Sequence, residues 1–466
     1  MAVLATVVVG LGCVRGSEPD VETGPPNIVL VSIDTLRPDH LSCYGYPRPT
    51  SPVIDRLASE GVLFANHISS SSWTLPAHAA LFTALEDSVH GCTDTDRVLG
   101  PDAVTLAEAL ADHGYLTAGF FSGPYLHPVF GLAQGFETYG DCTSYGALLE
   151  DEAVDQWAMD PGIMRRSHRD VTNPIVTGEV LSWLASARQP FFLFVHMWDV
   201  HFDFIPPPPY DSLFDPDYQG WVTGEDFFFD PRIHRGMAAR DLAHLVALYD
   251  GEIRWTDEHL GRIVARLEDG DLLDRTVVVI TGDHGTEFFE HGDKGHRKTL
   301  FDEVIRVPLV VRFPPALPAG VRVQAQTRAV DVAPTILALA GVRDQRLGSG
   351  PSLVELVNTG ARHTLPAVSE LFSVGRSLRA VRTPRWKVIH DLEQRAVLAF
   401  DLSLDPAERR PQARLDQGGW PARLATCRDV TEALAARTGE LPASARSGEL
   451  PTEVLEQLRA LGYAEN

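Results

Sequence analysis

Runs of apolar, β-branched residues alternate with helical patterns along most of this chain, and this alternation strongly constrains its fold. The first run, residues 27–33, is typical of a strand buried on both faces of a parallel sheet. A helix follows, with Ser51 as N-cap, Pro52 at its first position and Gly61 as its stop. The same reasoning predicts strands at residues 62–68, 116–121, 191–196, 276–281 and 307–313, and helices at residues 106–113, 240–268 and 331–339. We therefore expect an α/β fold with a doubly wound, mostly parallel sheet flanked by helices.

The pattern changes after about residue 365, where short strands and turns replace the long alternation. We expect a C-terminal subdomain over residues 366–466 that contains a small antiparallel sheet packed on the main domain. Its terminal helix is predicted at residues 452–463, which carry a stripe of aliphatic side chains. The predicted strands of this sheet are residues 377–382, 386–390 and 396–401.

The N-terminal segment, residues 1–26, is expected to be a leader that precedes a main domain of residues 27–365. Its first dozen residues are apolar but too few to span a bilayer, which is typical of a signal-peptide core. Leu11-Gly12-Cys13 resembles a bacterial lipobox, in which Cys13 would be lipidated. This favours an exported periplasmic or cell-surface lipoprotein that touches the membrane only through this anchor. The alternative is a cytoplasmic protein with an apolar first strand.

The charge of the chain limits its partners. Its 63 acidic and 40 basic residues give a formal net charge of −23. Nucleic-acid surfaces need clustered lysine and arginine, so we expect no nucleic-acid partner. An acidic protein can still bind a small anionic substrate when a metal ion supplies positive charge locally.

Four polar residues stand where the predicted elements would bring them together. Asp34 follows the strand at residues 27–33, Asp283 and His284 follow the strand at residues 276–281, and Thr74 opens a helix. The carboxyl ends of parallel strands meet at one edge of a sheet, where ligands collect. Carboxylate, hydroxyl and imidazole donors favour Mn²⁺ or Zn²⁺, with Ca²⁺ less suited to the nitrogen ligand. Each residue also has an ordinary interpretation, as a turn or, for Thr74, as a helix N-cap.

A set of ordered motifs then resembles the sulfatase family of the alkaline phosphatase superfamily across nearly the whole chain after the leader. Besides Gly282-Asp283-His284-Gly285, the motifs are Asp34-Thr35-Leu36-Arg37-Pro38-Asp39-His40-Leu41, Thr74-Leu75-Pro76-Ala77-His78, Asp199-Val200-His201, Arg306-Val307-Pro308, Asp331-Val332-Ala333-Pro334-Thr335 and Leu458-Arg459-Ala460-Leu461-Gly462-Tyr463. The resemblance implies an alkaline phosphatase-like fold, one divalent metal ion at Asp34, Thr74, Asp283 and His284, and a nucleophile at Thr74.

The resemblance also implies roles for three histidines. His201 matches a family histidine that contacts the transferred group or the leaving oxygen, and His296 stands where sulfatases usually have a substrate-binding lysine. A histidine there could bind an anionic oxygen or protonate the leaving group. His78 replaces the arginine that follows the family nucleophile, and we include it among the expected substrate-binding residues.

The departures from the family concern its chemistry. Sulfatases convert a cysteine or serine to formylglycine, but threonine cannot form that aldehyde, so we expect no formylglycine at Thr74. The basic residues that follow the family's Gly-Tyr motif are absent, because their positions fall on Ser122 and around Gly123-Pro124. The usual pair of aspartates after the first strand is reduced to Asp34-Thr35. These changes indicate a different catalytic solution rather than an ordinary sulfatase site.

Three functions remain open at this point. The first is a metal-dependent hydrolase of sulfate, phosphate or phosphonate esters that uses Thr74 as its nucleophile, with phosphorus esters favoured on mechanism. The second is a phosphoryl-group transferase similar to lipoteichoic acid synthases, and the third is an inactive, surface-anchored binding protein. Because an inactive protein has no need of Asp34, Asp283 and His284, we favour an enzyme. Two irregular segments, residues 141–173 and 202–234, are candidate lids, although their aromatic residues could equally form a hydrophobic cluster.

Overall fold

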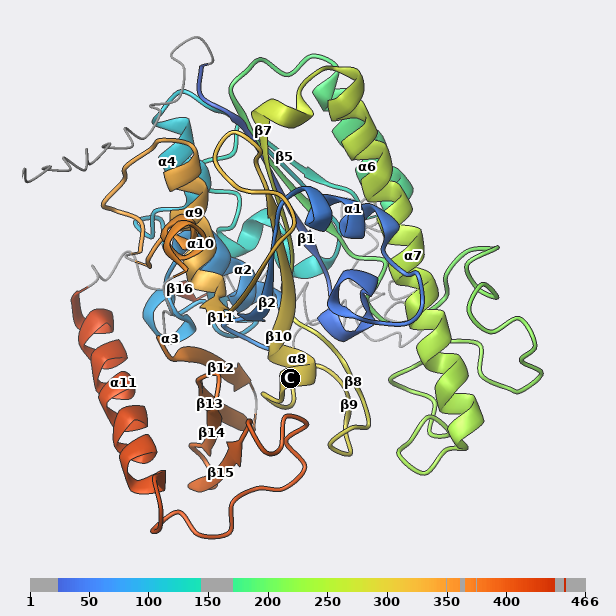
Figure 1. Ribbon diagram of the computed structural model, residues 1–466, viewed down its shortest axis with the longest axis vertical. Coiled ribbons are helices and arrows are strands. Elements are labelled where there is room, and N and C mark those ends of the chain that lie inside the picture. Colours follow the sequence, from blue (N-terminus) through green and yellow to red (C-terminus); the bar gives the residue numbers. More distant parts are fainter. Residues whose placement is uncertain are drawn as a thin grey trace, which may run out of the picture.

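A computed structural model describes residues 24–143, 171–348, 350–360, 365–373, 375–440 and 448–449. An eight-stranded sheet forms its centre (Figure 1), with the strand order β11-β2-β10-β7-β1-β6-β4-β5. β10 runs antiparallel to both of its neighbours, and the other pairs are parallel, so the sheet is mostly parallel as predicted. The strands are β1 (Asn27–Ile33), β2 (Val62–Ile68), β4 (Leu116–Phe121), β5 (Thr138–Asp141), β6 (Phe191–Met197), β7 (Thr276–Gly282), β10 (Arg306–Arg312) and β11 (Val321–Arg328).

Helices cover both faces of this sheet, as Figure 1 shows. One face packs against α2 (Thr74–Thr83), α4 (Leu106–Ala111), α9 (Val332–Leu339) and α10 (Leu353–Thr359). The other packs against α1 (Pro52–Glu60), α6 (Asn173–Leu184) and the long α7 (Ala239–Asp269). The central strands β1, β6 and β7 are buried along their whole length, which explains their continuous apolar sequences. Shorter elements are α3 (Asp87–His90), α8 (Asp302–Ile305), β3 (Arg97–Val98), β8 (Glu287–Phe288), β9 (Lys294–Gly295) and β16 (Gly448–Glu449).

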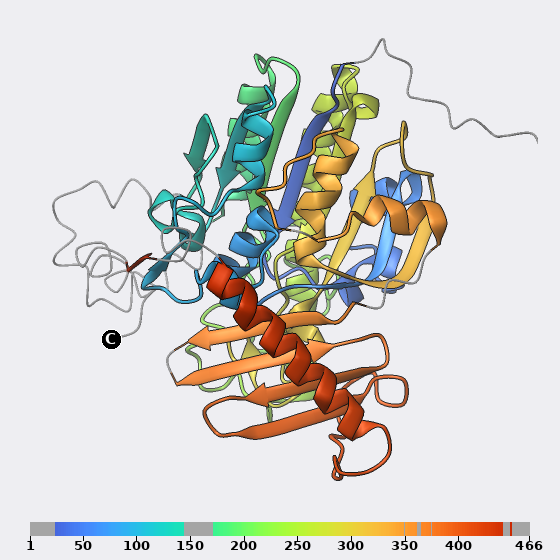
Figure 2. The same cartoon turned by 90° about the vertical axis from the view of Figure 1, so that its left-hand side faces the viewer.

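The C-terminal part forms a four-stranded antiparallel sheet, seen below the main sheet in Figure 2. Its strands are β12 (Ala367–Ser373), β13 (Arg376–Arg382), β14 (Trp386–Asp391) and β15 (Ala396–Asp401). One face of this sheet joins the main core through Leu378 and Phe400. The other face packs against α11 (Trp420–Glu440), where Val388 meets Trp420 and Cys427. The antiparallel sheet is thus confirmed, while the helix predicted at residues 452–463 lies outside the described residues.

The sequence prediction missed several elements, the longer ones being β5, α6, α10, β11, β12 and α11. β11 lies at the edge of the main sheet and alternates exposed and half-buried side chains over most of its length, so it lacks the apolar run that marks the other strands. α11 has no long apolar run and buries only a narrow stripe that includes Trp420, Cys427 and Leu434. Among the described residues, Cys43, Cys92, Cys142 and Cys427 are all free thiols. No helix in the described ranges combines the length and the apolar character needed to cross a membrane.

Candidate active site

Two neighbouring strand ends and one helix start bring the predicted ligands together. β1 and β7 pair in parallel with Ile33 opposite Gly282, so Asp34 and Asp283 leave the sheet side by side. Thr74 is the first residue of α2, and all four predicted ligand residues are buried. The N-cap of α2 is Trp73, so the Thr74 hydroxyl is not occupied in capping the helix. The N-cap interpretation of Thr74 is therefore wrong.

The spacing of the donor atoms fits a small divalent ion. His284 Nε2 lies 3.5 Å from Asp34 Oδ1 and 3.5 Å from Asp283 Oδ2. Thr74 Oγ1 lies 3.4 Å from both Asp34 Oδ2 and His284 Nε2. Two ligands that each lie about 2.1 Å from one ion at the tetrahedral angle are about 3.4 Å apart. Asp34, Asp283 and His284 alone also have donor atoms close enough together to hold a metal ion, and these three residues form the metal-binding group.

Hydrogen bonds around the site leave two carboxylate oxygens and one imidazole nitrogen available to bind a metal ion. Asp283 Oδ1 accepts the backbone N–H groups of Thr35 and His284, at 3.2 and 2.8 Å. Within the described chain, Asp283 Oδ2 and Asp34 Oδ1 are buried and have no hydrogen-bond partner. His284 Nδ1 donates to the carbonyl of Gly285 at 2.9 Å, which leaves the Nε2 lone pair directed at the carboxylates. Buried polar atoms without partners are rare, and a bound cation would satisfy these.

The electrostatics of the carboxylates agree with this interpretation. Burial raises the pKa of Asp34 to about 6, although His284 opposes that shift. Burial also raises the pKa of Asp283, and the neighbouring Asp34 raises it further. Two adjacent buried carboxylates are costly to ionise without a nearby positive charge. These residues therefore fit a divalent ion, which would hold both carboxylates ionised.

Two further histidines lie behind the carboxylates, in the protein interior. His78 Nδ1 donates to the Thr74 carbonyl at 2.8 Å, and its Nε2 then accepts from the Ser32 hydroxyl at 3.0 Å. Burial lowers the pKa of His78 to about 3, so the ring is neutral. The expectation that His78 contacts substrate does not match this position, because its side chain is fully buried and supports the backbone of the nucleophile. His196, which the sequence analysis did not single out, lies 3.5 Å from Asp34 through its Nε2.

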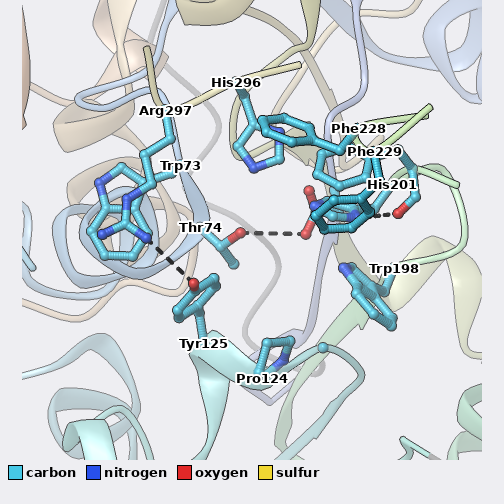
Figure 3. A pocket seen from close by; sticks show the side chains of 13 residues that line it. Trp73, Thr74, Pro124, Tyr125, Trp198, His201, Phe228, Phe229, His296 and Arg297 are labelled. Atoms are coloured by element: carbon cyan, nitrogen blue, oxygen red, sulfur yellow. Dashed lines mark hydrogen bonds between the residues drawn. The ribbon is translucent and has the colours of Figure 1, made fainter. Parts of the chain in front are cut away.

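The metal-binding group opens onto a cavity of about 240 Å³ (Figure 3). Asp34, Thr74, His201 and His296 all line it. The His296 ring centroid is 4.5 Å from that of His284 and 5.0 Å from that of His201. His201 Nδ1 donates to the Phe202 carbonyl at 2.7 Å, which fixes the orientation of its ring. The two predicted histidines thus flank the space in front of Thr74.

Arg297 is a cavity residue that sequence reasoning missed, although it directly follows His296. Its guanidinium lies 4.1 Å above the ring centroid of Trp73 and donates to Asp94 at 2.9 Å and to the Tyr125 hydroxyl at 3.4 Å. The residue has a φ of 61°, so the backbone turns sharply here. A family pattern that places a lysine near this point cannot reveal that turn. Arg297 therefore supplies the positive charge that the sequence analysis did not find.

The fold and the buried donor set define an ester hydrolase of the alkaline phosphatase type. The chain belongs to the sulfatase family: the Sulfatase family model matches residues 26–342. A model described as N-sulphoglucosamine sulphohydrolase, C-terminal, matches residues 289–415. Family membership supports a divalent metal ion at this site. The ordered motifs from residue 34 to residue 335 lie within the matched range, and the motif at residues 458–463 lies outside it.

Relatives with known activities or structures are distant. The N-acetylglucosamine-6-O-sulfatase of Bacteroides thetaiotaomicron is 24% identical over 83% of this chain and 82% of that protein. Mouse arylsulfatase K is 24% identical over 82% of this chain and 75% of that protein. The BT4656 protein, solved with its substrate D-glucosamine-2-N,6-O-disulfate, has a TM-score of 0.72 at 20% identity and covers 90% of this chain and 99% of its own. The phosphonate monoester hydrolase of Agrobacterium radiobacter has a TM-score of 0.68 at 24% identity, with 89% of this chain and 96% of that chain covered. These likenesses confirm the alkaline phosphatase-like fold.

Proposed function

We propose that this protein hydrolyses esters of phosphorus acids, with Thr74 as a metal-activated nucleophile. The observation that carries the proposal is the position of Thr74 Oγ1, 3.4 Å from a carboxylate oxygen and from an imidazole nitrogen of the metal-binding group. Asp34, Asp283 and His284 would hold the ion with Thr74. A bound divalent ion would lower the pKa of the hydroxyl and offset charge on the transferred group.

The residues of the chain account for the remaining steps. Thr74 Oγ1 gives up its proton to solvent and attacks phosphorus, and the bond from phosphorus to the leaving oxygen breaks as the new bond forms. His296 or His201 donates a proton to the leaving oxygen. Water then gives a proton to the same histidine and attacks phosphorus, the bond to Thr74 breaks, and Thr74 Oγ1 regains a proton from solvent as the acid is released. The N-terminal end of α2 favours negative charge on the Thr74 oxygen and on the substrate.

Phosphorus esters are favoured over sulfate esters because of how the covalent intermediate must break down. A formylglycine hydrate expels sulfate by collapsing to its aldehyde, and a threonine ester has no such route. A phospho-threonine can instead be released by attack of water at phosphorus. The fold is shared with sulfatases and with phosphonate monoester hydrolases, so it is compatible with hydrolysis of either sulfate esters or phosphorus esters.

Hydrolysis of matched nitrophenyl esters tests this proposal. Sulfate, phosphate monoester, phosphate diester and phosphonate esters would each be offered with Mn²⁺, Zn²⁺ or Ca²⁺. We expect turnover of a phosphorus ester that falls at least about 10³-fold in Thr74→Ala, together with a phosphoryl adduct on Thr74 in the acid-quenched wild type. Thr83→Ala, at the other end of α2, is the matched control and should keep its activity. Sulfate turnover that survives Thr74→Ala would overturn the mechanism.

We further propose that residues 1–26 export the protein and that Cys13 carries a lipid. The support is the short apolar run followed by a lipobox-like tripeptide. Expression in a bacterial host fed labelled palmitate would test it, with Cys13→Ser as the control. Label in the wild type alone would support the anchor, and an unlabelled cytoplasmic wild type would overturn it.

A further inference from the structure

The cavity in front of Thr74 is walled mainly by aromatic rings. They come from separate segments: the start of α2, the turn after β4, the end of β6, and the irregular segment at residues 202–234 (Figure 3). Phe202 and Phe228 are stacked with centroids 5.3 Å apart, and Trp73 and Tyr125 meet edge to face at 5.2 Å. The six aromatic residues that line the cavity are Trp73, Tyr125, Trp198, Phe202, Phe228 and Phe229.

Two glycines make room for this wall. Gly123 has a φ of +89°, and a Cβ built on it would lie 3.1 Å from Cδ1 of Trp198. Gly295 has a φ of +80°, and its Cβ would lie 3.0 Å from a ring carbon of Phe228. Side chains other than glycine would be strained at both positions and would crowd these rings. The backbone is thus shaped to hold the aromatic side chains where they are.

The polar side chains of the same wall already have other roles: His201 and His296 flank the reacting group at Thr74, and Arg297 donates to the Tyr125 hydroxyl. Among the described residues lining the cavity, Asp34 is the one carboxylate, and it belongs to the metal-binding group. The same set of lining residues contains no asparagine or glutamine. A sugar ring carries several hydroxyls, and those that face the phenyl rings would lose water without gaining a partner. An apolar ring buries its surface there without that cost.

The positive charge in the wall is also limited. Arg297 is the one guanidinium among the described lining residues, and Asp94 already pairs with it at 2.9 Å. The Arg297 guanidinium also stacks on Trp73, 4.1 Å from the ring centroid, so it packs within the aromatic wall while carrying its charge. This arrangement suits a substrate with a single anionic group at Thr74 and none on its leaving group.

We propose that the cavity binds the leaving group of the ester as an apolar, ring-bearing alcohol, and that Phe228 and Phe229 determine this preference. The inference rests on the proposed function, since it assigns the cavity to the alcohol that departs when Thr74 attacks. It sets this chain apart from the BT4656 protein, whose solved complex holds an aminosugar disulfate. Phe229 lines the cavity and is 37% exposed overall, so it can be changed without disturbing the core.

The test compares two esters of the same phosphorus acid, one of benzyl alcohol and one of glucose at its primary hydroxyl. Both alcohols are primary, so the comparison reports mainly on recognition of the ring. We expect kcat/KM for the benzyl ester to exceed that for the glucose ester by at least about tenfold. In Phe228→Ala and Phe229→Ala this ratio should fall about tenfold. Phe214→Ala is the matched control, because Phe214 lies in the same segment but does not line the cavity, and its ratio should not change.

Binding to Thr74→Ala in the presence of Mn²⁺ separates this inference from the proposed function. Calorimetric titration would measure the affinity for each intact ester without turnover. Tighter binding of the benzyl ester, weakened at least threefold by an added Phe229→Ala change, supports the inference even if no ester is hydrolysed by the wild type. Equal or tighter binding of the glucose ester would overturn it, even if Thr74-dependent hydrolysis is found.

Discussion

His196 Nε2 lies 3.5 Å from Asp34 Oδ2, yet neither ring nitrogen of His196 has a hydrogen-bond partner within the described part of the chain. The residue stands on β6 opposite Ser32 of β1, so its ring lies beside the carboxylate from within the sheet. Burial lowers the pKa of His196 to about 4, which makes the ring neutral near pH 7. A neutral ring carries one N–H group. If that group is on Nε2, it points at Asp34 Oδ2 and would orient the carboxylate so that Oδ1 faces the ion.

We predict that His196→Phe weakens divalent-metal affinity about tenfold, because the carboxylate loses the group that orients it. The metal-free variant should be at least as stable as the wild type, because burying the polar His196 ring is costly and an apolar ring removes that cost. Calorimetric titration with Mn²⁺ or Zn²⁺ measures the first effect, and thermal unfolding in chelator measures the second.

His67→Phe provides the control for this experiment. His67 is also buried and also has a ring nitrogen without a partner, but it lies on β2 beside Thr327. Its replacement should leave metal affinity unchanged. Unchanged affinity in both variants would mean that His196 only fills space behind Asp34.

The raised pKa of Asp34 predicts how stability depends on pH. The pKa of Asp34 is about 6 in the folded protein and 3.8 in the unfolded chain, so the folded state binds the proton more tightly. Its stabilising contribution is complete below about pH 4 and is lost as the pH rises through 6. The loss amounts to about 3 kcal/mol. Metal-free protein should therefore unfold at lower temperature at pH 7 than at pH 4.5, and added metal should remove the deficit above pH 6.

Asp34→Asn isolates this effect from the other titrating groups. The variant should show a flatter stability profile between pH 4 and 6 and no stabilisation by metal. Thermal unfolding across that range, with chelator and with Mn²⁺, measures both. A wild-type profile that matches the variant in chelator would show that Asp34 does not titrate in this window.

The clustering of the candidate metal-binding residues could be predicted from the sequence because each of them is tied to the end of an element. Asp34 and Asp283 each follow an apolar run, and parallel strands must bring such ends to one edge of the sheet. Thr74 was placed correctly for the same reason, as the first residue of a helix. The prediction that His201 and His296 belong to the site came from the family resemblance, because helix and strand periodicity gives no reason to select them.

The rest of the site depends on contacts between distant segments. His196 looks like an ordinary residue of an apolar strand, and only the pairing of β6 with β1 brings it to Asp34. His78 was expected to contact substrate because of its place in a motif, but its helix turns it toward Ser32 and the core. Helix and strand periodicity predict which face of an element is buried, and they do not predict which neighbour that face meets.

A buried lysine holds the C-terminal sheet to the main domain, and its loss should be costly. Lys387 on β14 lies 3.0 Å from Asp302 and 2.8 Å from Glu408, with its side chain fully buried. Lys387→Met leaves two buried carboxylates short of positive charge and should lower the free energy of unfolding by about 3–5 kcal/mol. Urea unfolding measures this loss. Lys298→Met is the control: it removes a half-buried lysine 3.9 Å from Asp293 and should lower the free energy of unfolding by less than about 1 kcal/mol. Equal losses in the two variants would contradict this role for Lys387.

The position of His296 between His284 and His201 predicts a dependence on the leaving group. If His296 protonates the leaving oxygen, its loss matters most for alcohols that depart poorly without a proton. His296→Asn should lower turnover of a benzyl ester by about 10²-fold or more, while turnover of the nitrophenyl ester of the same acid falls less than about tenfold. Initial rates for the two esters give this ratio directly. His291→Asn, five residues earlier, where the ring stacks on Phe301 and bonds Glu303, should change both rates alike. A uniform loss in His296→Asn would assign the residue to binding the transferred group, and proton donation would then fall to His201.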